Sequence, residues 1–374
     1  TEVSAAVAKA AIESGVARKT ITDWDEYKNR LKQMLGQETK FTRTLHATAA
    51  LHPQRVVFAE GGHQTMMKAA VTALQEGICH PILLGNPDRL NRLAKRLKLD
   101  LTGVEIVDMR ADKEQGRRAT YAKHLSEKRA RQGVTFEEAY DKMYERNYFG
   151  MSMVEQGDAD AFITGLYTKY SNTIKVAKEV IGVRKDYNTF ATMHILNSKR
   201  GAIYVADTLI NRHPNQDVLY DVARLSEHTV KFFNQDPVIA MVSYSNFGTD
   251  EVGSPVAVHQ AVEKLQHDFP DMVVDGEMQV NFALNRELRD DKYPFTRLKG
   301  KDVNTIVFAN MNAANSSYKL IQALDPDCEI VGPVQMGLNK PIHFTDFEAS
   351  VSDVFNVTAV AVIDAYVDEV KNNK

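Results

Sequence analysis

The chain has 374 residues, and this length predicts two domains rather than one. Charged residues make up 25% of the chain but nearly cancel to a formal net charge of −3, which argues against a nucleic-acid-binding protein. No apolar run is long enough to span a membrane, the N-terminus lacks the pattern of a secretory signal, and Cys79 and Cys328 lack metal-binding spacing, so we expect a cytoplasmic protein with reduced thiols and no metal site.

Residues 1–35 predict helices with no strand of their own to pack on. The Ala-rich opening stretch places apolar residues on one helical face and stops at Gly15, and Thr22 or Asp23 can cap a second helix. The pattern by itself indicates an N-terminal helical arm.

From residue 54 onward, short apolar runs alternate with helical patterns. Strands are expected at residues 55–60, 81–85, 104–108, 160–165, 202–206, 238–243, 273–274 and 305–308. Helices are expected near residues 66–76, 87–97, 114–132, 135–145, 216–233, 255–268 and 352–372. This alternation indicates βαβ units and a mostly parallel sheet.

Several loops carry groups that suit a small anion. After what we take for a central strand, Ser243, Ser245, Asn246 and Gly248 offer hydroxyl, amide and main-chain donors, although a Ser-rich turn also serves as ordinary capping. Further along, Asn312 and Asn315 stand at the head of a helix, where they either cap it or face a ligand. Asp275 and Glu277 are too few acids to predict a metal site.

The stretch from Val331 to Asp353 begins as a Gly/Pro-punctuated loop and ends at a long helical pattern, a place where α/β proteins bind ligands. Its sequence is GPVQMGLNKPIHFTDFEASVSD, which resembles the closing motif of phosphotransacetylases, G-P-x-x-x-G-L-x-K-P-V-x-x-L-S-R-G-x-S-x-x-D. The Ser and Arg positions of that motif hold Asp346 and Phe347 here, while the last acid is kept as Asp353.

Other motifs carry the same resemblance. AEGGHQT resembles the family's E-G-E-D-x-R, with Thr65 at the arginine position. Arg129 matches a binding arginine, and Lys175 replaces a second one. The resemblance implies an acyl-CoA or anion site made of Arg129, Lys169, Lys175, Ser243, Ser245, Asn246, Gly248, Gln279, Asn281, Asn312, Asn315, Lys340 and Asp353. Because Thr65, Asp346 and Phe347 replace groups of the family's active site, we expect no catalytic residue.

The N-terminal stretch EVSAAVAKAAIESGVARKTI resembles the end of the nicotinamide domain of bacterial malic enzymes. In this order, the two resemblances describe the hybrid malic enzymes, whose C-terminal half is phosphotransacetylase-like. They imply residues 1–38 as the end of the nicotinamide domain and a linker, residues 39–185 with 335–374 as a discontinuous first domain, and residues 186–334 as a second. The implied fold is two three-layer α/β/α domains with mostly parallel sheets and a cleft between them.

The implied function is a regulatory and oligomerising domain of an NADP-dependent malic enzyme, which binds acetyl-CoA and is not itself catalytic. The resemblance implies no cofactor in this stretch, and it implies NADP with Mg or Mn in an N-terminal malic-enzyme half. Its implied partners are that half and further copies of the chain, in a dimer through the second domain, with no nucleic acid and no membrane. Two alternatives stay open: an active phosphate acetyltransferase, and a structural assembly domain without a ligand.

Overall fold

The computed structural model describes residues 2–17, 21, 24, 27, 40–167, 169–198, 201–325 and 328–372. Its strands are β1 (Gln54–Phe58), β2 (Cys79–Leu84), β3 (Glu105–Val107), β4 (Ala161–Thr164), β5 (Ala191–Ser198), β6 (Gly201–Ala206), β7 (Ile239–Val242), β8 (Val274–Met278), β9 (Thr305–Phe308), β10 (Glu329–Met336) and β11 (Ile342–Phe344). Its helices are α1 (Glu2–Glu13), α3 (Lys40–Leu51), α4 (Gln64–Gln75), α5 (Pro87–Leu97), α6 (Gln115–Lys128), α7 (Phe136–Lys142), α8 (Arg146–Glu155), α9 (Tyr170–Val180), α10 (Gln216–Phe232), α11 (Ser254–Asp268), α12 (Val280–Leu284), α13 (Arg286–Lys292), α14 (Met311–Leu324) and α15 (Val351–Asn372), with short 3-10 turns at Asp112–Glu114 and Ala130–Gln132.

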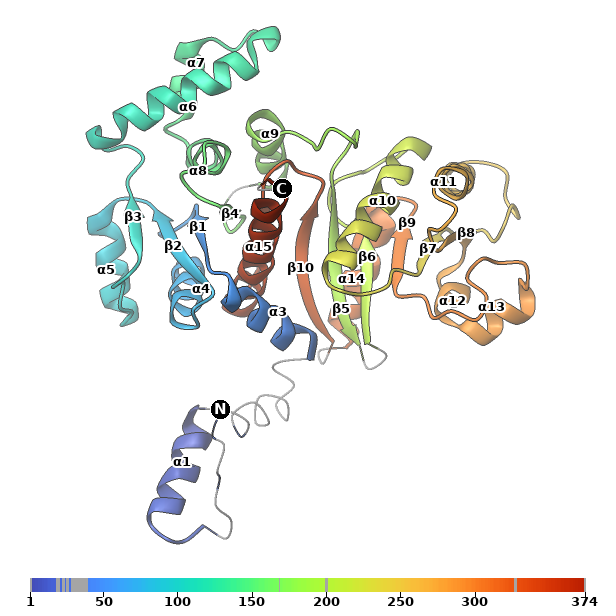
Figure 1. Ribbon diagram of the computed structural model, residues 1–374, viewed down its shortest axis with the longest axis horizontal. Coiled ribbons are helices and arrows are strands. Elements are labelled where there is room, and N and C mark those ends of the chain that lie inside the picture. Colours follow the sequence, from blue (N-terminus) through green and yellow to red (C-terminus); the bar gives the residue numbers. More distant parts are fainter. Residues whose placement is uncertain are drawn as a thin grey trace.

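The first sheet is entirely parallel, in the order β11-β4-β1-β2-β3. Its central strand β1 is a continuous apolar run whose residues Val56, Val57 and Phe58 are fully buried, as expected of a strand covered on both faces. Helices α3 and α4 pack on α15 beside β1, and α8 and α9 form a second layer, from which α6 and α7 project (Figure 1). The expected three-layer α/β/α architecture is confirmed for this part of the chain.

The second sheet is mixed, in the order β10-β5-β6-β9-β7-β8. Strands β6, β9, β7 and β8 are parallel, whereas β5 is antiparallel to both β6 and β10. Two sequence predictions are corrected here. Residues 331–336, expected as the start of a loop, belong to strand β10, with a register shift between Val331 and Val334 that accommodates the Gly-Pro pair. Strand β7 is next to the edge of the sheet and not at its centre.

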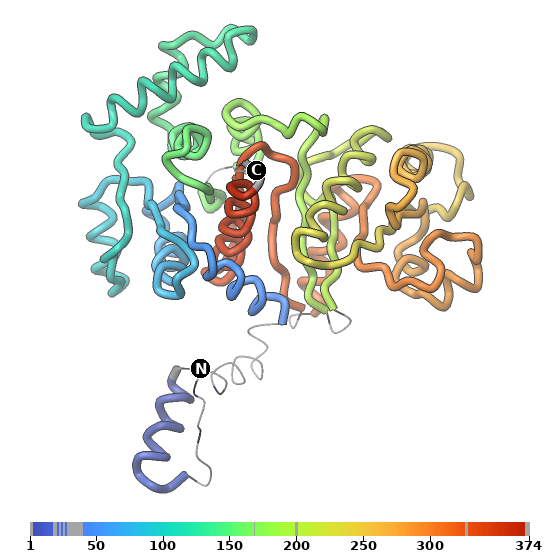
Figure 2. The backbone as a smooth tube through the Cα atoms, viewed as in Figure 1, coloured from blue at the N-terminus to red at the C-terminus, as the bar shows by residue number. Residues whose placement is uncertain are grey.

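The two sheets are joined by the C-terminal part of the chain. After β10, residues 337–341 cross to β11 in the first sheet, and α15 then contacts both β1 and β10. Figure 2 shows this red C-terminal helix between the blue β1 region and the orange-red β10. One apolar core runs through both sheets, from Val56 on β1 through Val360 on α15 to Met193 on β5 and Leu219 on α10. The two sheets therefore share a packed interface.

The predicted N-terminal helix is present as α1, while the proposed caps Thr22 and Asp23 lie outside the described residues. Cys79 and Cys328 are both buried, unpaired thiols, and burial raises the pKa of Cys79 to about 12. Among the helices of the described residues, none has the length and apolar character needed to cross a bilayer.

Candidate functional site

The two domains meet in an ion pair at the position that the sequence singled out. Asp346 follows β11 of the first sheet, and its Oδ2 lies 2.9 Å from Nζ of Lys319 on α14 of the second domain. Burial disfavours the charged form of Lys319, but the bond to Asp346 outweighs this and raises the pKa of the ammonium. The sequence identified Asp346 as the replacement of the motif's serine, and the structure shows that Lys319 neutralises its charge.

Beside this ion pair lies a buried histidine. His194 on β5 stacks on Tyr318 of α14 with ring centroids 4.1 Å apart, and its Nδ1 lies 2.9 Å from Oγ1 of Thr208. Burial lowers the pKa of His194 to about 3, and the nearby Lys319 adds to this effect. We call His194, Thr208, Tyr318, Lys319 and Asp346 the junction cluster. Its imidazole is neutral at physiological pH, so the cluster carries one cation and one anion.

A buried glutamate shapes the loop that follows β4. Glu60 is 1% exposed, and its carboxylate accepts backbone N–H bonds from Gly165, Leu166 and Tyr167 at 2.8 to 3.0 Å. Gly165 also touches the next loop, because a Cβ built on it would lie 2.2 Å from the backbone oxygen of Thr345. The loops after β4 and β11 are therefore locked against each other, one residue before Asp346.

Two of the predicted anion ligands gather around Glu179 on α9. The Glu179 carboxylate accepts bonds from the Tyr148 hydroxyl at 2.6 Å and Lys142 at 3.2 Å, and Lys175 lies 3.8 Å away. Burial alone would raise the pKa of Glu179, but these donors lower it. The charge of Arg129 acts on the same Tyr148, and the buried Nε of Arg129 has no hydrogen-bond partner within the described residues. We call these five residues the Glu179 cluster.

The predicted donors after β7 form a separate group. Ser245 Oγ and the Gly248 N–H both donate to Oε1 of the fully buried Glu277, at 3.1 and 2.5 Å. Asn246 Oδ1 accepts the Gln279 N–H, and Gln279 Nε2 donates to a backbone carbonyl at 2.7 Å. These groups hold their own loops together instead of facing the junction. Strand β7 is also four strands from β10, or about 19 Å at the usual spacing.

A lone exception in that group is Ser243, whose buried Oγ has no partner among the described residues. Nearby, Asp275 accepts from Thr296 Oγ1 at 2.6 Å and from the Arg297 N–H at 2.8 Å, so its oxygens are satisfied by the protein. No group of three acidic, histidine or cysteine side chains suited to a metal ion occurs in the part of the chain that the structure describes.

The remaining predicted residues are scattered. Lys169, Asn281, Asn312 and Phe347 are exposed, and Thr65 lies in the first turn of α4 with its N–H donating to His63. Helix α14 is capped by Asn310 rather than by Asn312 or Asn315. Asn315 donates to the Thr208 carbonyl at 3.3 Å and so belongs beside the junction cluster. Asp353 accepts the Ser350 N–H at 2.8 Å and donates its own N–H to Ser350 Oγ, which makes it a capping residue of α15.

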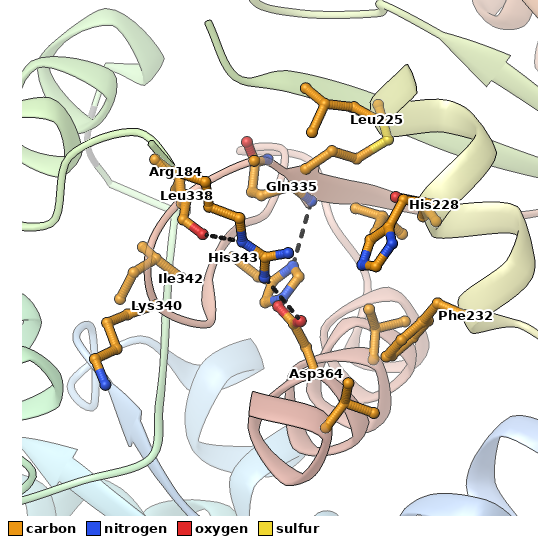
Figure 3. A pocket seen from close by; sticks show the side chains of 16 residues that line it. Arg184, Leu225, His228, Phe232, Gln335, Leu338, Lys340, Ile342, His343 and Asp364 are labelled. Atoms are coloured by element: carbon orange, nitrogen blue, oxygen red, sulfur yellow. Dashed lines mark hydrogen bonds and ion pairs between the residues drawn. The ribbon is translucent and has the colours of Figure 1, made fainter. Parts of the chain in front are cut away.

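Lys340 lines a small cavity between β10, α10 and α15, together with Arg184, His343 and Asp364 (Figure 3). Arg184 Nε donates to the Leu338 carbonyl at 3.0 Å, and His343 Nε2 lies 3.3 Å from Asp364. The cavity measures about 30 Å³, which suits a water molecule rather than a coenzyme. Lys340 is thus placed at the packed domain interface.

Residues 40–362 match the protein family described as "Phosphate acetyl/butaryl transferase". The chain belongs to this family. It is 29% identical to a phosphate acetyltransferase from Thermoanaerobacterium thermosaccharolyticum, over 85% of this chain and 97% of that protein. A phosphotransacetylase crystal structure from Streptococcus pyogenes superposes with a TM-score of 0.78 at 26% identity, covering 87% of this chain and 99% of that one. The expected fold is confirmed.

The chain is also 34% identical to the NADP-dependent malic enzymes of Salmonella typhimurium and Escherichia coli, over 97% of its own length. It spans about half the length of these curated relatives, 48% in both cases. The expected homology to both malic enzymes and phosphate acetyltransferases is therefore confirmed, and the chain corresponds to a phosphotransacetylase-like part of the longer proteins.

Sequence reasoning assigned no role to Glu60 or to four residues of the junction cluster, which are His194, Thr208, Tyr318 and Lys319. Tyr318 and Lys319 belong to the segment FANMNAANSSYK, which matches the family pattern F-P-x-L-x-x-x-N-x-x-Y-K, so the resemblance contained them without assigning them a role. Glu60 likewise stands in the retained part of its motif. His194 had no signal, because its strand β5 was not predicted and its partners come from distant segments.

The buried His194 makes the stability of the chain depend on pH. Unfolding returns its pKa from about 3 to about 6.5, so the unfolded state binds a proton that the folded state does not, and stability increases with pH across this window. Lowering the pH from 7 to 5 should cost about 2 kcal/mol through this residue. The free energy of unfolding, measured by urea titration at each pH, should depend less steeply on pH in His194→Gln than in the wild type. His80→Gln, a change at an exposed site, should keep the wild-type slope, and equal slopes in all three proteins would refute the assignment.

Proposed function

We propose that this chain is a regulatory and oligomerising domain of an NADP-dependent malic enzyme, which binds acetyl-CoA without turning it over. The parent protein would oxidatively decarboxylate malate to pyruvate, with NADP and a divalent metal bound in its other half. The observation that carries the non-catalytic assignment is the Lys319 to Asp346 ion pair. Asp346 stands where the family motif has its serine. Its carboxylate is paired with the Lys319 ammonium at 2.9 Å.

The groups that acyl transfer requires are incomplete at this junction. The transfer needs cations on the phosphate, a base or an oriented thiol, and donors to the developing oxyanion. The exposed Phe347 replaces the motif's arginine, Thr65 replaces another, and the neutral His194 is sealed from solvent and bonded to Thr208. A substrate phosphate would have to compete with Asp346 for Lys319. We infer that transferase activity is absent or very low.

The Glu179 cluster supports retained binding of an anionic ligand. It places Lys142 and Lys175 at the Glu179 carboxylate, with the charge of Arg129 acting on Tyr148, and the buried Arg129 Nε lacks a partner among the described residues. The Arg129 guanidinium has no carboxylate partner among the described residues and so offers a charge-assisted hydrogen bond to a phosphate group of acetyl-CoA. Exposed Leu320, Ile321 and Leu324 on α14 add an apolar surface on the second domain that fits the proposed self-association.

Calorimetry on the full chain tests the sensing role. We expect saturable acetyl-CoA binding that weakens roughly 5- to 10-fold in Lys175→Gln, because one cation of the Glu179 cluster is removed. Asp346→Asn should tighten binding if the coenzyme reaches the junction, since Lys319 is then released. Lys123→Gln is the matched control, as the side chains of Lys123 and Lys175 are 73% and 72% exposed. Absence of binding at millimolar acetyl-CoA would remove the sensing role.

A phosphate acetyltransferase is the second candidate, favoured by the near-complete coverage of the Thermoanaerobacterium thermosaccharolyticum protein. Coenzyme A-dependent loss of acetyl phosphate, measured with the same preparation, decides between the two. Turnover well above a blank would establish the transferase and overturn the regulatory proposal. If neither binding nor turnover is found, the chain is an assembly domain, and its mass in solution becomes the relevant measurement.

A further inference from the structure

A second cavity, whose lining contains no residue of the junction cluster, lies at the carboxyl edge of the first sheet. It measures about 670 Å³, within the range of small-molecule sites, and is lined by residues that follow β1, β2, β3 and β4 and by the start of α8. The strand order reverses between β1 and β4, since the chain proceeds from β1 to β2 and β3 on one side and to β4 on the other. Ligands of parallel α/β sheets bind outside such a reversal.

Three arginines line this cavity: Arg89, Arg110 and Arg146. Within the described residues, none of their guanidinium groups forms an ion pair or a hydrogen bond. Arg146 is half-buried and lies over the ring of Tyr167, with 5.6 Å between its Cζ and the ring centroid. Guanidinium groups usually meet carboxylates inside proteins, so three unpaired ones around one cavity indicate a site for an external anion.

Asn147 provides an independent observation. Its side chain is 5% exposed and lines the cavity, and its Oδ1 accepts from Thr164 Oγ1 at 3.1 Å. Its amide nitrogen forms no hydrogen bond in the part of the chain that the structure describes, so this donor, on a side chain that is itself nearly buried, is left for a ligand. Glu145, the N-cap of α8, makes no side-chain capping bond, and the first-turn N–H groups beside Asn147 therefore lack a side-chain acceptor.

The carboxylates around the cavity are mostly engaged elsewhere. Glu60 accepts the loop N–H bonds described above, and Asp108 accepts from Asn86 Nδ2 at 3.2 Å and from the Arg110 N–H at 3.1 Å. Of the three carboxylates that line the cavity, only Glu145 is exposed and without a hydrogen-bond or ion-pair partner among the described residues. The groups without a partner are thus three guanidinium groups and one amide as donors, and the Glu145 carboxylate at the start of α8 as the acceptor.

We propose that this arginine pocket, defined by Arg89, Arg110, Arg146 and Asn147, is a second ligand site that binds the phosphate group of a phosphorylated small molecule. The phosphate lies against Arg146 and the Asn147 amide at the start of α8, with Arg89 and Arg110 closing over it. The site is separate from the proposed acetyl-CoA site, because none of its lining residues belongs to the junction cluster or the Glu179 cluster.

A calorimetric titration of the full chain with inorganic phosphate, in a low-salt buffer, tests this site. We expect saturable millimolar binding that weakens about 10-fold in Arg146→Gln and several-fold in Arg110→Gln, because each loses a charge-assisted bond. Arg110 is exposed, so its variant tests the site even if Arg146→Gln folds poorly. Glu145→Gln should bind phosphate more tightly. Arg92→Gln is the control, an exposed arginine on the same helix as Arg89 but outside the cavity.

Equal weakening in the Arg92 and Arg146 variants would mean general charge attraction and would overturn the proposal, as would the absence of saturable binding. Saturating acetyl-CoA should leave phosphate binding unchanged, and competition between them would show one shared site instead of two. The phosphate titration does not require acetyl-CoA to bind. A failure of the sensing role and a failure of the arginine pocket are therefore distinguished by the same set of measurements.

Discussion

Replacing Gly165 with alanine should destabilise the protein by ~3 kcal/mol or more and displace the loop before Asp346. The backbone at Gly165 has φ +140°, and the added Cβ would lie 2.2 Å from the oxygen and 2.7 Å from the nitrogen of Thr345. Both atoms belong to the backbone, so no side-chain rearrangement relieves the overlap. The β4 and β11 loops would have to separate, and the junction cluster would be displaced with them. Chemical denaturation and acetyl-CoA calorimetry measure the two effects.

Gly157→Ala is the control for this substitution. Gly157 also has a positive φ, +79°, but a Cβ there meets nothing within 4 Å. The Gly157→Ala substitution should lower the free energy of unfolding by about 1 kcal/mol, the backbone strain of a left-handed residue, and leave ligand binding unchanged. Similar losses for both variants would show that φ alone matters, and the close approach of the two loops would then have no role.

Replacing Glu60 with glutamine should cost about 2 to 4 kcal/mol and loosen the loop after β4. Two backbone N–H groups, of Gly165 and Leu166, point at Oε2, and that of Tyr167 points at Oε1. Glutamine keeps one acceptor oxygen and places an NH₂ group against at least one of these donors. Hydrogen exchange of the three amides should accelerate, and the unfolding midpoint in urea should fall.

Glu76→Gln is the comparison for this change, because Glu76 is exposed and has no side-chain partner among the described residues. It should change the stability by less than about 0.5 kcal/mol. If the three loop amides exchange their hydrogens at the wild-type rate in Glu60→Gln, the Glu60 carboxylate does not hold the loop in place. The role assigned to this part of the family motif would then have to be abandoned.

Much of the first domain could be predicted from the sequence. Apolar runs such as Val56 to Phe58 are buried on both faces, and Asn86 followed by Pro87 marks the start of α5, so local chemistry and tertiary structure agree. The prediction failed where a pattern was ambiguous. The stretch from Val331 contains Gly and Pro and was predicted to begin as a loop, but residues 331–336 pair with β5 at a sheet edge, where a strand tolerates both residue types.

The candidate site was less predictable. The sequence identified Asp346 as the departure from the family motif, yet its partner Lys319 lies 27 residues away on α14. The donors Ser245, Gly248 and Asn246 looked available, and their partners Glu277 and Gln279 became visible only once β7 and β8 were paired. Donor chemistry is a property of a residue, whereas availability depends on what the fold places next to it.

By itself, the sequence determined the family, the alternation of strands and helices, and the replacement of the motif's serine and arginine by Asp346 and Phe347. These are local properties, set by side-chain type and spacing along the chain. Only the tertiary structure decided that Asp346 is neutralised by Lys319, that burial lowers the pKa of His194, and that three arginines without an ion-pair partner among the described residues share one cavity. Each of these results depends on side chains far apart in sequence, whose mutual distance and desolvation are fixed only when the two sheets pack.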